Sequence, residues 1–382
     1  MKLTVRARIL RLAKQHKRQA PVHTAAALAL SLGLMLILAA LPSPAADAAP
    51  GDDAAIFTAT MVGDIMPGRY VQKAAAAQGN YDYLFDNMRP WLEQSDYVSG
   101  NFETPVLVGR SASDDETLLF TQPQAVEALA RANFSVLNLA NDHMMDYGEQ
   151  SLMDTIQTFA EQDMKTVGAG ATEAKAASYI IQEFNGIQVA SLGFSDVYPQ
   201  GARAQGEKAG IAAAQVESYM EQILAAKATA DLVVVNIHWG EEHQAVASDE
   251  QQRMAREMAS AGADLIVGHH SNVLQPVEVF NNSIIFYGLG NFAFDQGWSE
   301  TRRTVLARYH LAADGQATVE LVPAWVEGGR PRPLGAGLLD RVQRQRIQRR
   351  LTSGEGSPDM EWRDGNLYFE LDHSHIMGSD GK

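Results

Sequence analysis

Beyond Gly51, short apolar runs rich in β-branched residues alternate with segments rich in Ala, Gln, Glu and Met. The runs have the length and composition of buried strands, and the segments between them have the character of covering helices. This alternation predicts βα units around a mostly parallel or mixed sheet, and therefore an α/β fold. The predicted strands are Ile56–Val62, Tyr97–Ser99, Ser135–Leu139, Gln188–Gly193, Leu232–Ile237, Asp264–Val267 and Ser283–Tyr287. The predicted helices are Gln122–Ala132, Glu149–Gln162, Ala214–Ala228 and Asp249–Ala261.

After Asn291 the pattern changes to antiparallel strands and one basic helix. We predict strands at Val305–His310, Thr318–Ala324 and Asn366–Glu370. The helix Leu338–Leu351 contains five arginines, and we expect a solvated helix in preference to a site for an anionic surface. Residues 52–300 are therefore expected to form a core, 301–372 to complete the same domain, and 373–382 to be a tail.

The first 48 residues have the pattern of an export signal. A basic stretch, Arg6–Arg18, precedes the apolar run Thr24–Leu41, which is followed by a segment rich in Ala and Pro. An apolar run of this length is close to the ~20 residues that span a bilayer. A cleaved signal peptide and a retained membrane anchor both remain open, and either one predicts that the rest of the chain is exported.

Composition removes several classes of protein. The chain has 382 residues, no Cys and a formal charge of −15. Without Cys there is no disulfide framework and no thiolate ligand, so any metal must be held by His, Asp, Asn or Glu. Residues 1–48 contain seven Lys or Arg and one acid, so the remainder carries a charge of −21. Such an acidic body would repel phosphates, which argues against nucleic-acid binding.

Five of the predicted strands end in polar residues that can bind a metal ion. These residues are Asp64, Glu103, Asp142 with His143, His238 with Glu241, and His269 with His270. Taken singly, each could belong to a turn, a helix cap or a buried hydrogen-bonded histidine. Because ligands of α/β sheets bind at the carboxyl ends of strands, we expect the five ends to converge on one place.

Oxygen and imidazole ligands without thiolate suit Mn²⁺, Fe or Zn²⁺, and a carboxylate-rich set also admits Mg²⁺. A metal of this kind activates water and polarises phosphoryl or carbonyl oxygens, which predicts hydrolytic chemistry. His143, oriented by Asp146, could protonate a leaving group, and Arg69 could offer a forked donor to a phosphate or carboxylate. The motifs of serine hydrolases, zinc proteases and P-loop proteins are absent from the sequence.

At these residues the chain resembles the bacterial CapA-type capsule-synthesis family, which is associated with poly-γ-glutamate production. The matching segments are Met61–Met66 with Gly68 and Arg69, Gly100–Glu103, Leu139–His143 with Asp146–Gly148, His238–Glu241, Gly268–His270 with Val273–Gln275, Tyr287–Phe292 and Phe294–Gln296. The resemblance implies a metallophosphatase-like layered α/β/β/α sandwich, with the metal-site motifs at the carboxyl ends of strands.

The resemblance also implies roles for individual residues. The implied metal ligands are Asp64, Glu103, Asp142, His238 and His270, with Glu103 bridging two sites. The candidate substrate-binding residues are Arg69, Asn141, Glu241, His269 and Asn291. Met66 and Asn272 stand where metallophosphatases have His, so we expect one eroded site and a single tightly bound divalent ion.

Three functions remain open at this stage. The first is an exported envelope protein that acts in synthesis or export of an anionic polymer such as poly-γ-glutamate, beside membrane capsule-synthesis subunits. The second is an exported metallophosphoesterase with a phosphate-containing substrate and no role in capsule formation. The third is a scaffolding subunit without catalysis, whose metal site is degenerate. The sequence leaves open whether the centre turns over a substrate.

Overall fold

Two β-sheets form the middle of the molecule. The computed structural model describes residues 55–109, 118–297 and 300–377, together with isolated positions between residues 14 and 31. The ten-stranded sheet has the order β17 (Glu361–Arg363), β18 (Asn366–Asp372), β15 (Gln316–Glu327), β14 (Arg303–Ala312), β1 (Ala55–Ile65), β2 (Tyr97–Phe102), β3 (Val136–Asn138) and β4 (Lys165–Val167). Two short strands extend it: β13 (Asn291–Ala293) pairs with β1, and β16 (Arg330–Pro333) pairs with β15.

The six-stranded sheet has the order β11 (Val277–Phe280), β12 (Ser283–Phe286), β10 (Leu265–His269), β9 (Leu232–His238), β7 (Ile187–Ser195) and β6 (Ile180–Phe184). A small pair is formed by β5 (Ala169–Gly170) and β8 (Gly210–Ile211). The helices are α2 (Arg69–Gln78), α3 (Arg89–Glu93), α4 (Pro123–Arg131), α5 (Gly148–Ala160), α6 (Glu173–Ala177), α7 (Val216–Lys227), α8 (Asp249–Ala261) and α9 (Leu338–Leu351), with 3₁₀ turns at Asp82–Leu84 and Ser374–Ile376.

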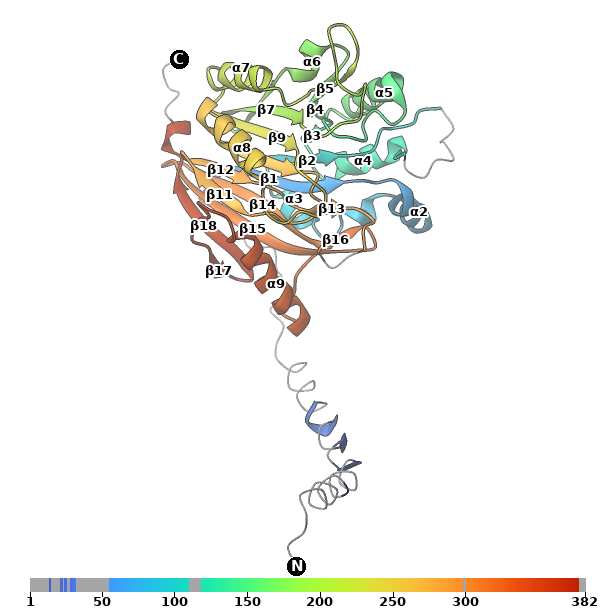
Figure 1. Ribbon diagram of the computed structural model, residues 1–382, viewed down its shortest axis with the longest axis vertical. Helices are drawn as coiled ribbons and strands as arrows, with labels where there is room; N and C mark the ends of the chain where they lie inside the picture. The colour runs from blue at the N-terminus through green and yellow to red at the C-terminus, as the bar shows by residue number, and fades with distance from the viewer. Residues whose placement is uncertain are drawn as a thin grey trace, which may run out of the picture.

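Three hydrophobic clusters separate four layers of structure. One lies between the ten-stranded sheet and helices α2 to α5, one between the two sheets, and one between the six-stranded sheet and helices α7 and α8. Figure 1 shows α7 and α8 on the outer side of the six-stranded sheet. The α/β/β/α sandwich expected from the sequence is therefore confirmed, because each sheet buries one face against the other sheet and one against helices.

Side-chain alternation along the strands explains this layering. On β9, Leu232 and Val234 face the other sheet, whereas Val233 and Val235 face the helices. Successive residues of a strand point to opposite faces, so a strand that is apolar throughout must be covered on both sides. The apolar runs of the sequence therefore encode a sheet that is buried on both faces.

The C-terminal part of the chain belongs to the same sheet as β1. Strand β14 pairs antiparallel with β1, and β15 and β18 continue the sheet outward. The helix α9 adds Ile347 and Leu351 to the layer between the sheets. The chain stays packed up to the end of its described part, because His373 is fully buried and its Nε2 lies 2.6 Å from the carbonyl oxygen of Asn282.

The proposed signal or anchor, residues 1–48, lies outside the described residues apart from the isolated positions noted above. Within the part of the chain that the structure describes, no helix combines the length and the apolar character needed to cross a bilayer.

Candidate metal centre

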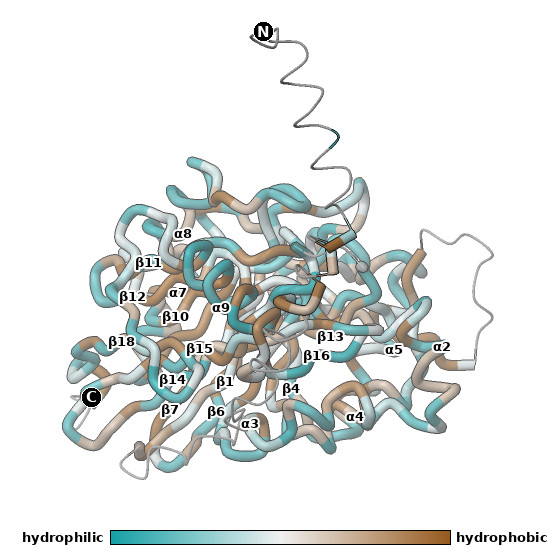
Figure 2. Tube along the Cα trace, turned by 90° about the horizontal axis from the view of Figure 1, so that it is seen from below, coloured by the Kyte–Doolittle hydropathy of each residue, from teal (hydrophilic) through white to brown (hydrophobic). Residues whose placement is uncertain are grey.

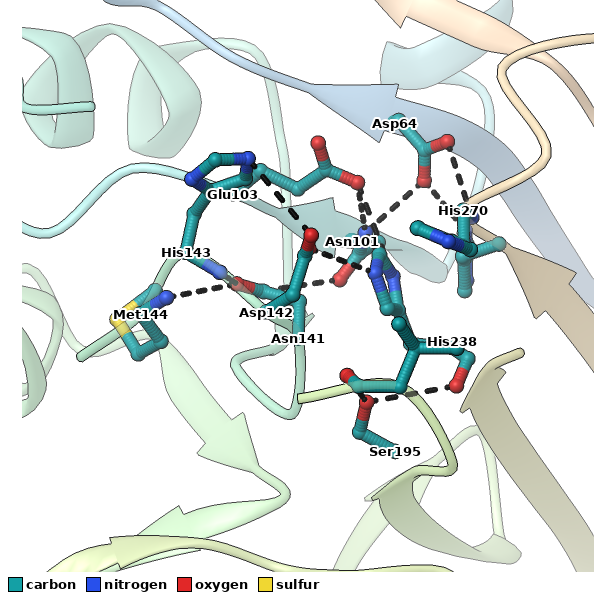
Figure 3. Close-up of polar contacts among 12 residues, drawn as sticks. Asp64, Asn101, Glu103, Asn141, Asp142, His143, Met144, Ser195, His238 and His270 are labelled. Carbon is teal, nitrogen blue, oxygen red and sulfur yellow. Dashed lines mark hydrogen bonds and ion pairs between the residues drawn. The ribbon is translucent and has the colours of Figure 1, made fainter. Parts of the chain in front are cut away.

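The five predicted ligands meet at the carboxyl ends of strands from both sheets. They come from β1 (Asp64), the residues after β2 (Glu103) and β3 (Asp142), the end of β9 (His238) and the residue after β10 (His270). Figure 3 shows their side chains gathered around Asn101. Two groups have donor atoms that all lie within 4.8 Å of one another: Asp142, His238 and His270 form the first, and Asp64, Glu103 and His238 form the second.

His238 is the residue that the two groups share. Its Nε2 lies 3.0 Å from Asp142 Oδ1, and its Nδ1 lies 3.7 Å from Glu103 Oε1. The ring centroids of His238 and His270 are 4.6 Å apart. The bridging role that the resemblance implies for Glu103 stays a prediction, and the geometry adds His238 as a residue common to both groups.

Asn101 lies at the centre of the site and was not among the predicted ligands. Its Nδ2 lies 2.9 Å from Asp64 Oδ1, 2.8 Å from Glu103 Oε1 and 3.3 Å from His238 Nδ1. Its Oδ1 accepts hydrogen bonds from the amides of Asn138 and Asn141. The one sequence signal was its position in Gly100–Glu103, at the end of a buried strand.

Glycines immediately before two of the predicted site residues allow backbones to approach closely. A Cβ at Gly63 would lie 1.7 Å from the carbonyl oxygen of Gly290, and one at Gly268 would lie 2.0 Å from that of Tyr287. No side chain fits at such distances, so these positions admit only glycine. The Gly–Asp and Gly–His–His motifs therefore reflect strand packing as well as chemistry.

The turn after β10 brings His270 back toward β1. His270 has a φ of 85°, in the left-handed region that residues with a side chain rarely adopt. Its backbone N–H donates to Asp64 Oδ2 at 3.3 Å. Such strain persists when the surroundings fix it, and it is common at functional sites.

Met66 and Asn272, the two departures noted in the sequence, are both buried. The Met66 sulfur accepts the Gly68 N–H at 3.3 Å. Asn272 donates its amide to His270 O and Glu242 Oε1, at 3.1 and 3.2 Å. Both side chains are therefore engaged next to the centre.

The three carboxylates, of which Asp64 and Glu103 are buried and Asp142 is half-buried, have different electrostatic environments. Burial, together with the charges of Asp64 and Asp142, raises the pKa of Glu103 well above its usual value. Burial also acts to raise the pKa of Asp64, but contacts with His269, His238 and Asn101 outweigh it and lower that pKa. The same competition lowers the pKa of Asp142, where the hydrogen bond to His238 and the charges of the neighbouring histidines together outweigh burial. Burial lowers the pKa of His270 to about 4, so its ring is neutral at neutral pH.

This donor set fits a divalent cation. Three carboxylates and two imidazoles contribute oxygen and nitrogen atoms without sulfur, which suits Mn²⁺, Fe or Zn²⁺. Among the described residues, no Lys or Arg forms an ion pair with Asp64, Glu103 or Asp142. Buried carboxylates without a counter-charge are costly, and a bound cation would relieve that cost.

His143 and Asp146 form a dyad at the rim of the site. His143 Nδ1 lies 3.0 Å from Asp146 Oδ2, which also accepts the backbone N–H of Leu119. Burial acts to lower the pKa of His143, but the hydrogen bond to Asp146 and the charge of Asp142 outweigh it and raise that pKa. The side chain of His143 is 30% exposed, so its ring reaches solvent.

Arg69 lies near this dyad and is held by Asp295. Its Nη2 lies 2.7 Å from Asp295 Oδ1, and its guanidinium lies over the ring of Phe294. The positive charge of Arg69 acts on the pKa of His143, which it lowers. The side chain is 40% exposed, which leaves part of the guanidinium open to a ligand.

The other predicted substrate-binding residues occupy different environments. His269 is fully buried, with Nδ1 3.1 Å from Asp64 Oδ1, so it supports the centre from within. Asn141 is buried and donates to Phe102 O, while its Oδ1 accepts the Met144 N–H. Asn291 on β13 is buried and pairs with Asp64 of β1 in the strand register. Its Oδ1 is buried and has no hydrogen-bond partner among the described residues. Glu241 is exposed on the loop after β9.

Fold and centre together define a two-sheet α/β protein with a candidate divalent-metal site at its strand ends. Residues 58–296 match the family described as bacterial capsule synthesis protein PGA_cap, and the chain belongs to this family. It is 40% identical over 388 residues to the capsule biosynthesis protein CapA of Bacillus anthracis, covering 98% of this chain and 93% of that one. It is 39% identical over 386 residues to the PGA biosynthesis protein CapA of Bacillus subtilis, covering 99% of both.

Solved structures with a related arrangement are more distant. A 5′-nucleotidase precursor from Thermus thermophilus has 15% sequence identity and a TM-score of 0.42. The alignment covers 77% of this chain and 59% of the nucleotidase.

Proposed function

We propose that this protein acts in capsule polymer synthesis at the cell envelope, through a metal-dependent hydrolytic step on a phosphate ester or an amide bond. Its family membership supports the role in capsule and poly-γ-glutamate biosynthesis. The hydrolytic step rests on the centre itself. Export is inferred from the basic and apolar pattern of residues 6–41.

One observation carries the hydrolytic proposal. Five residues spread over about two hundred positions of sequence contribute donor atoms to two overlapping groups, and a His–Asp dyad lies beside them. Structural histidines need only one partner each, whereas this arrangement collects three acidic and two imidazole groups in one buried place. A divalent ion held there would supply charge for a developing oxyanion and acidify water toward neutral pH.

The two groups differ in how completely they could hold an ion. His238 would use Nε2 in the group with Asp142 and His270, and Nδ1 in the group with Asp64 and Glu103. A histidine ligand normally binds through one ring nitrogen and gives the other to a hydrogen bond. If Nε2 binds, the second group retains only its two carboxylates, so we infer one tight ion beside one weak position.

The dyad supplies the proton chemistry. Asp146 accepts the hydrogen bond from His143 Nδ1, which leaves Nε2 directed toward the centre, 3.8 Å from Asp142 Oδ2. The raised pKa of His143 favours the imidazolium form, in which Nε2 carries a proton that it can give to a leaving group. Arg69 would hold a phosphate or carboxylate of the substrate near this proton.

The test is turnover of model substrates by metal-reconstituted protein. Phosphomonoester, phosphodiester and γ-glutamyl amide substrates should be compared, with His143→Ala and His238→Ala as variants. We expect His143→Ala to lower kcat about 10²- to 10⁴-fold, because it removes the general acid. The exposed His243, changed to Asn, is the control, since Asn tolerates the positive φ of 63° there. Activity that survives both alanine changes would refute the proposal.

A scaffolding function without catalysis is the second candidate. It is favoured by the thioether of Met66 and the amide of Asn272, which stand where metallophosphatases have imidazole, and by the amide at position 101 between the carboxylates. Under this alternative, the protein binds a metal ion but turns over none of the three substrates, and His143→Ala leaves capsule formation intact. If the protein cleaves phosphodiesters and deletion of its gene causes no capsule defect, the result would favour the remaining candidate, an exported metallophosphoesterase with no role in capsule formation.

A further inference from the structure

A cavity outside the candidate metal centre lies between α9 and the start of β14. It has a volume of about 380 Å³ and is lined by Leu274, Glu300, Arg303, Arg346, Arg349 and Arg350. This volume is within the ~300–1,000 Å³ typical of sites for small ligands. Figure 2 shows α9 on the near side of the molecule, coloured hydrophilic over much of its length. We call this cavity the arginine pocket.

The charge of the arginine pocket is opposite to that of the whole protein. Arg346, Arg349 and Arg350 lie three and four residues apart on α9, so they share one face of the helix. Within the described ranges, the side chains of Arg346 and Arg349 have neither a hydrogen bond nor an ion pair, and both are exposed. Glu300 is the one acidic residue in the lining. Four guanidinium groups therefore face one carboxylate in a chain whose formal charge is −15.

The buried member of the pocket, Arg303, points to a ligand independently of the exposed arginines. Its residue is 5% exposed, and its Nε donates to Gln343 Oε1 of α9 at 2.8 Å. Its Nη1 pairs with Glu300, but its Nη2 is buried without any hydrogen-bond partner among the described residues. Buried guanidinium N–H groups are costly to leave unpaired, and nearly all are satisfied in folded proteins. An oxyanion in the pocket would supply the missing acceptor.

We propose that the arginine pocket binds carboxylate groups of an acidic polymer chain. Planar guanidinium groups bind carboxylates through two parallel hydrogen bonds, which favours this chemistry over a single ammonium contact. The acidic remainder of the protein would repel a polyanion, so the polymer would be held at this pocket. The choice of γ-linked polyglutamate as the polymer rests on the proposed function in capsule synthesis.

The pocket is joined to the candidate metal centre by short loops. Leu274, in its lining, follows His270 by four residues on the turn after β10. Arg350 Nη1 donates to the carbonyl oxygen of Ala245 at 3.1 Å, on the loop that follows His238. A polymer held by the arginines would therefore contact the loops that carry two of the proposed metal ligands.

Binding of poly-γ-glutamate to the full-length chain tests the proposal. The variant Arg346→Gln/Arg349→Gln removes two exposed charges that have neither a hydrogen bond nor an ion pair with any described residue, so it should fold normally. We expect its affinity for the polymer to fall at least about tenfold at low salt, and the wild-type affinity to fall steeply as salt is raised. The control Lys73→Gln/Lys165→Gln removes the same charge from exposed positions in α2 and β4, and should bind like wild type.

Three further arms identify the ligand. Arg303→Lys keeps the positive charge but removes the planar guanidinium group that can form two parallel hydrogen bonds. It should therefore weaken polymer binding while its melting temperature stays within a few degrees of the wild-type value. Inorganic phosphate and vesicles of anionic lipid should bind the wild type and the two-arginine variant equally. The proposal would be overturned if the two-arginine variant bound the polymer as well as the lysine control does. It would also be overturned if the two arginines were needed for binding phosphate or vesicles but not for binding the polymer. Turnover of small substrates should be measured in parallel, and we expect it to be unchanged in the two-arginine variant. A failure of the hydrolytic proposal would then appear as absent turnover in the wild type, independently of polymer binding.

Discussion

Changing Glu320 to Gln should destabilise the ten-stranded sheet strongly at neutral pH and much less in acid. Glu320 on β15 faces Arg308 on β14 in the strand register, and each residue is 1% exposed. The two groups form a buried ion pair. Asn366 and Tyr368 on β18 both donate to Glu320 Oε1 at 2.7 Å, so one carboxylate joins three strands.

The size of the effect follows from the pKa of Glu320. Burial acts to raise this pKa, but hydrogen bonds from His310 and Tyr368 and the charge of Arg308 outweigh it and lower the pKa to about 2 from 4.5. At 1.36 kcal/mol per unit, this difference corresponds to about 3 kcal/mol of stability. Because the folded-state pKa is the lower one, that stability is fully present above pH 4.5 and is lost as pH falls toward 2.

The variant Glu320→Gln cannot titrate and leaves the Arg308 guanidinium buried without its counter-charge. We expect a loss of about 3–5 kcal/mol in the free energy of unfolding at pH 7. Urea unfolding of wild type and variant at pH 7, 5, 4 and 3 measures the gap between them. The gap should be about 2 kcal/mol smaller at pH 3 than at pH 7.

The control is Glu370→Gln on β18, an exposed carboxylate that pairs with Arg363 at 2.9 Å. Exposed pairs contribute little, so its unfolding free energy should stay within about 0.5 kcal/mol of wild type at every pH. A gap between wild type and Glu320→Gln that is the same at pH 7 and pH 3 would refute the reasoning.

Two predictions concern the candidate centre directly. Purified protein should retain one equivalent of a divalent metal after dialysis. The variant His238→Ala should lose this metal, because both donor groups contain His238. Metal analysis that finds two equivalents, each resistant to dialysis, would contradict this prediction. Asp146→Asn should lower kcat on the order of tenfold with little change in KM, since the amide still accepts the Leu119 N–H but no longer stabilises the His143 imidazolium; a change confined to KM would show that Asp146 acts in substrate binding.

Much of the layered fold could be predicted from local patterns. Strand β9 begins with the apolar run Leu232–Val235, and α8 carries a capping box between Ser248 and Gln251 that marks its start. The strands that were missed depend on partners elsewhere in the chain. β13 has three residues and exists because it pairs with β1, and β6 alternates between half-buried and exposed positions at a sheet edge. The residues of a short strand do not indicate which distant strand it pairs with.

The meeting of the five proposed ligands could be predicted because strand ends of α/β sheets converge. Asn101 was missed because an amide inside a strand resembles any buried asparagine, and its importance comes from three neighbours on other strands. The predicted role of His269 in substrate binding stays a prediction, and its place beside His238 in the register of β10, next to Asp64, could not be read from the sequence. The basic helix that supplies three arginines of the arginine pocket was predicted, with a solvated helix preferred to an anionic site; the pocket itself also needs Arg303, more than forty residues before Arg346, packed against α9.

The variant Asn101→Asp separates a metal centre from a structural network of polar groups. The amide of Asn101 donates to Asp64 and Glu103, so an aspartate would add a third carboxylate within contact of two others. Without a cation, we expect a loss of several kcal/mol in unfolding free energy, because the added charge is buried and repelled. With a divalent ion, the same carboxylate becomes an additional ligand.

Thermal unfolding in EDTA and in Mn²⁺ measures this difference. Ligand binding stabilises the folded state by about 2.7 kcal/mol when the free ion is at a hundred times its Kd. Mn²⁺ should therefore raise the melting temperature of the wild type, and raise that of Asn101→Asp by more. Asn138→Asp is the matched control, since Asn138 is equally buried and its hydrogen bonds go to Asn101 and the backbone of Ala140, whereas those of Asn101 reach Asp64 and Glu103. If Mn²⁺ leaves all three proteins unchanged, the carboxylates and histidines form a structural network, and the hydrolytic proposal fails with the metal.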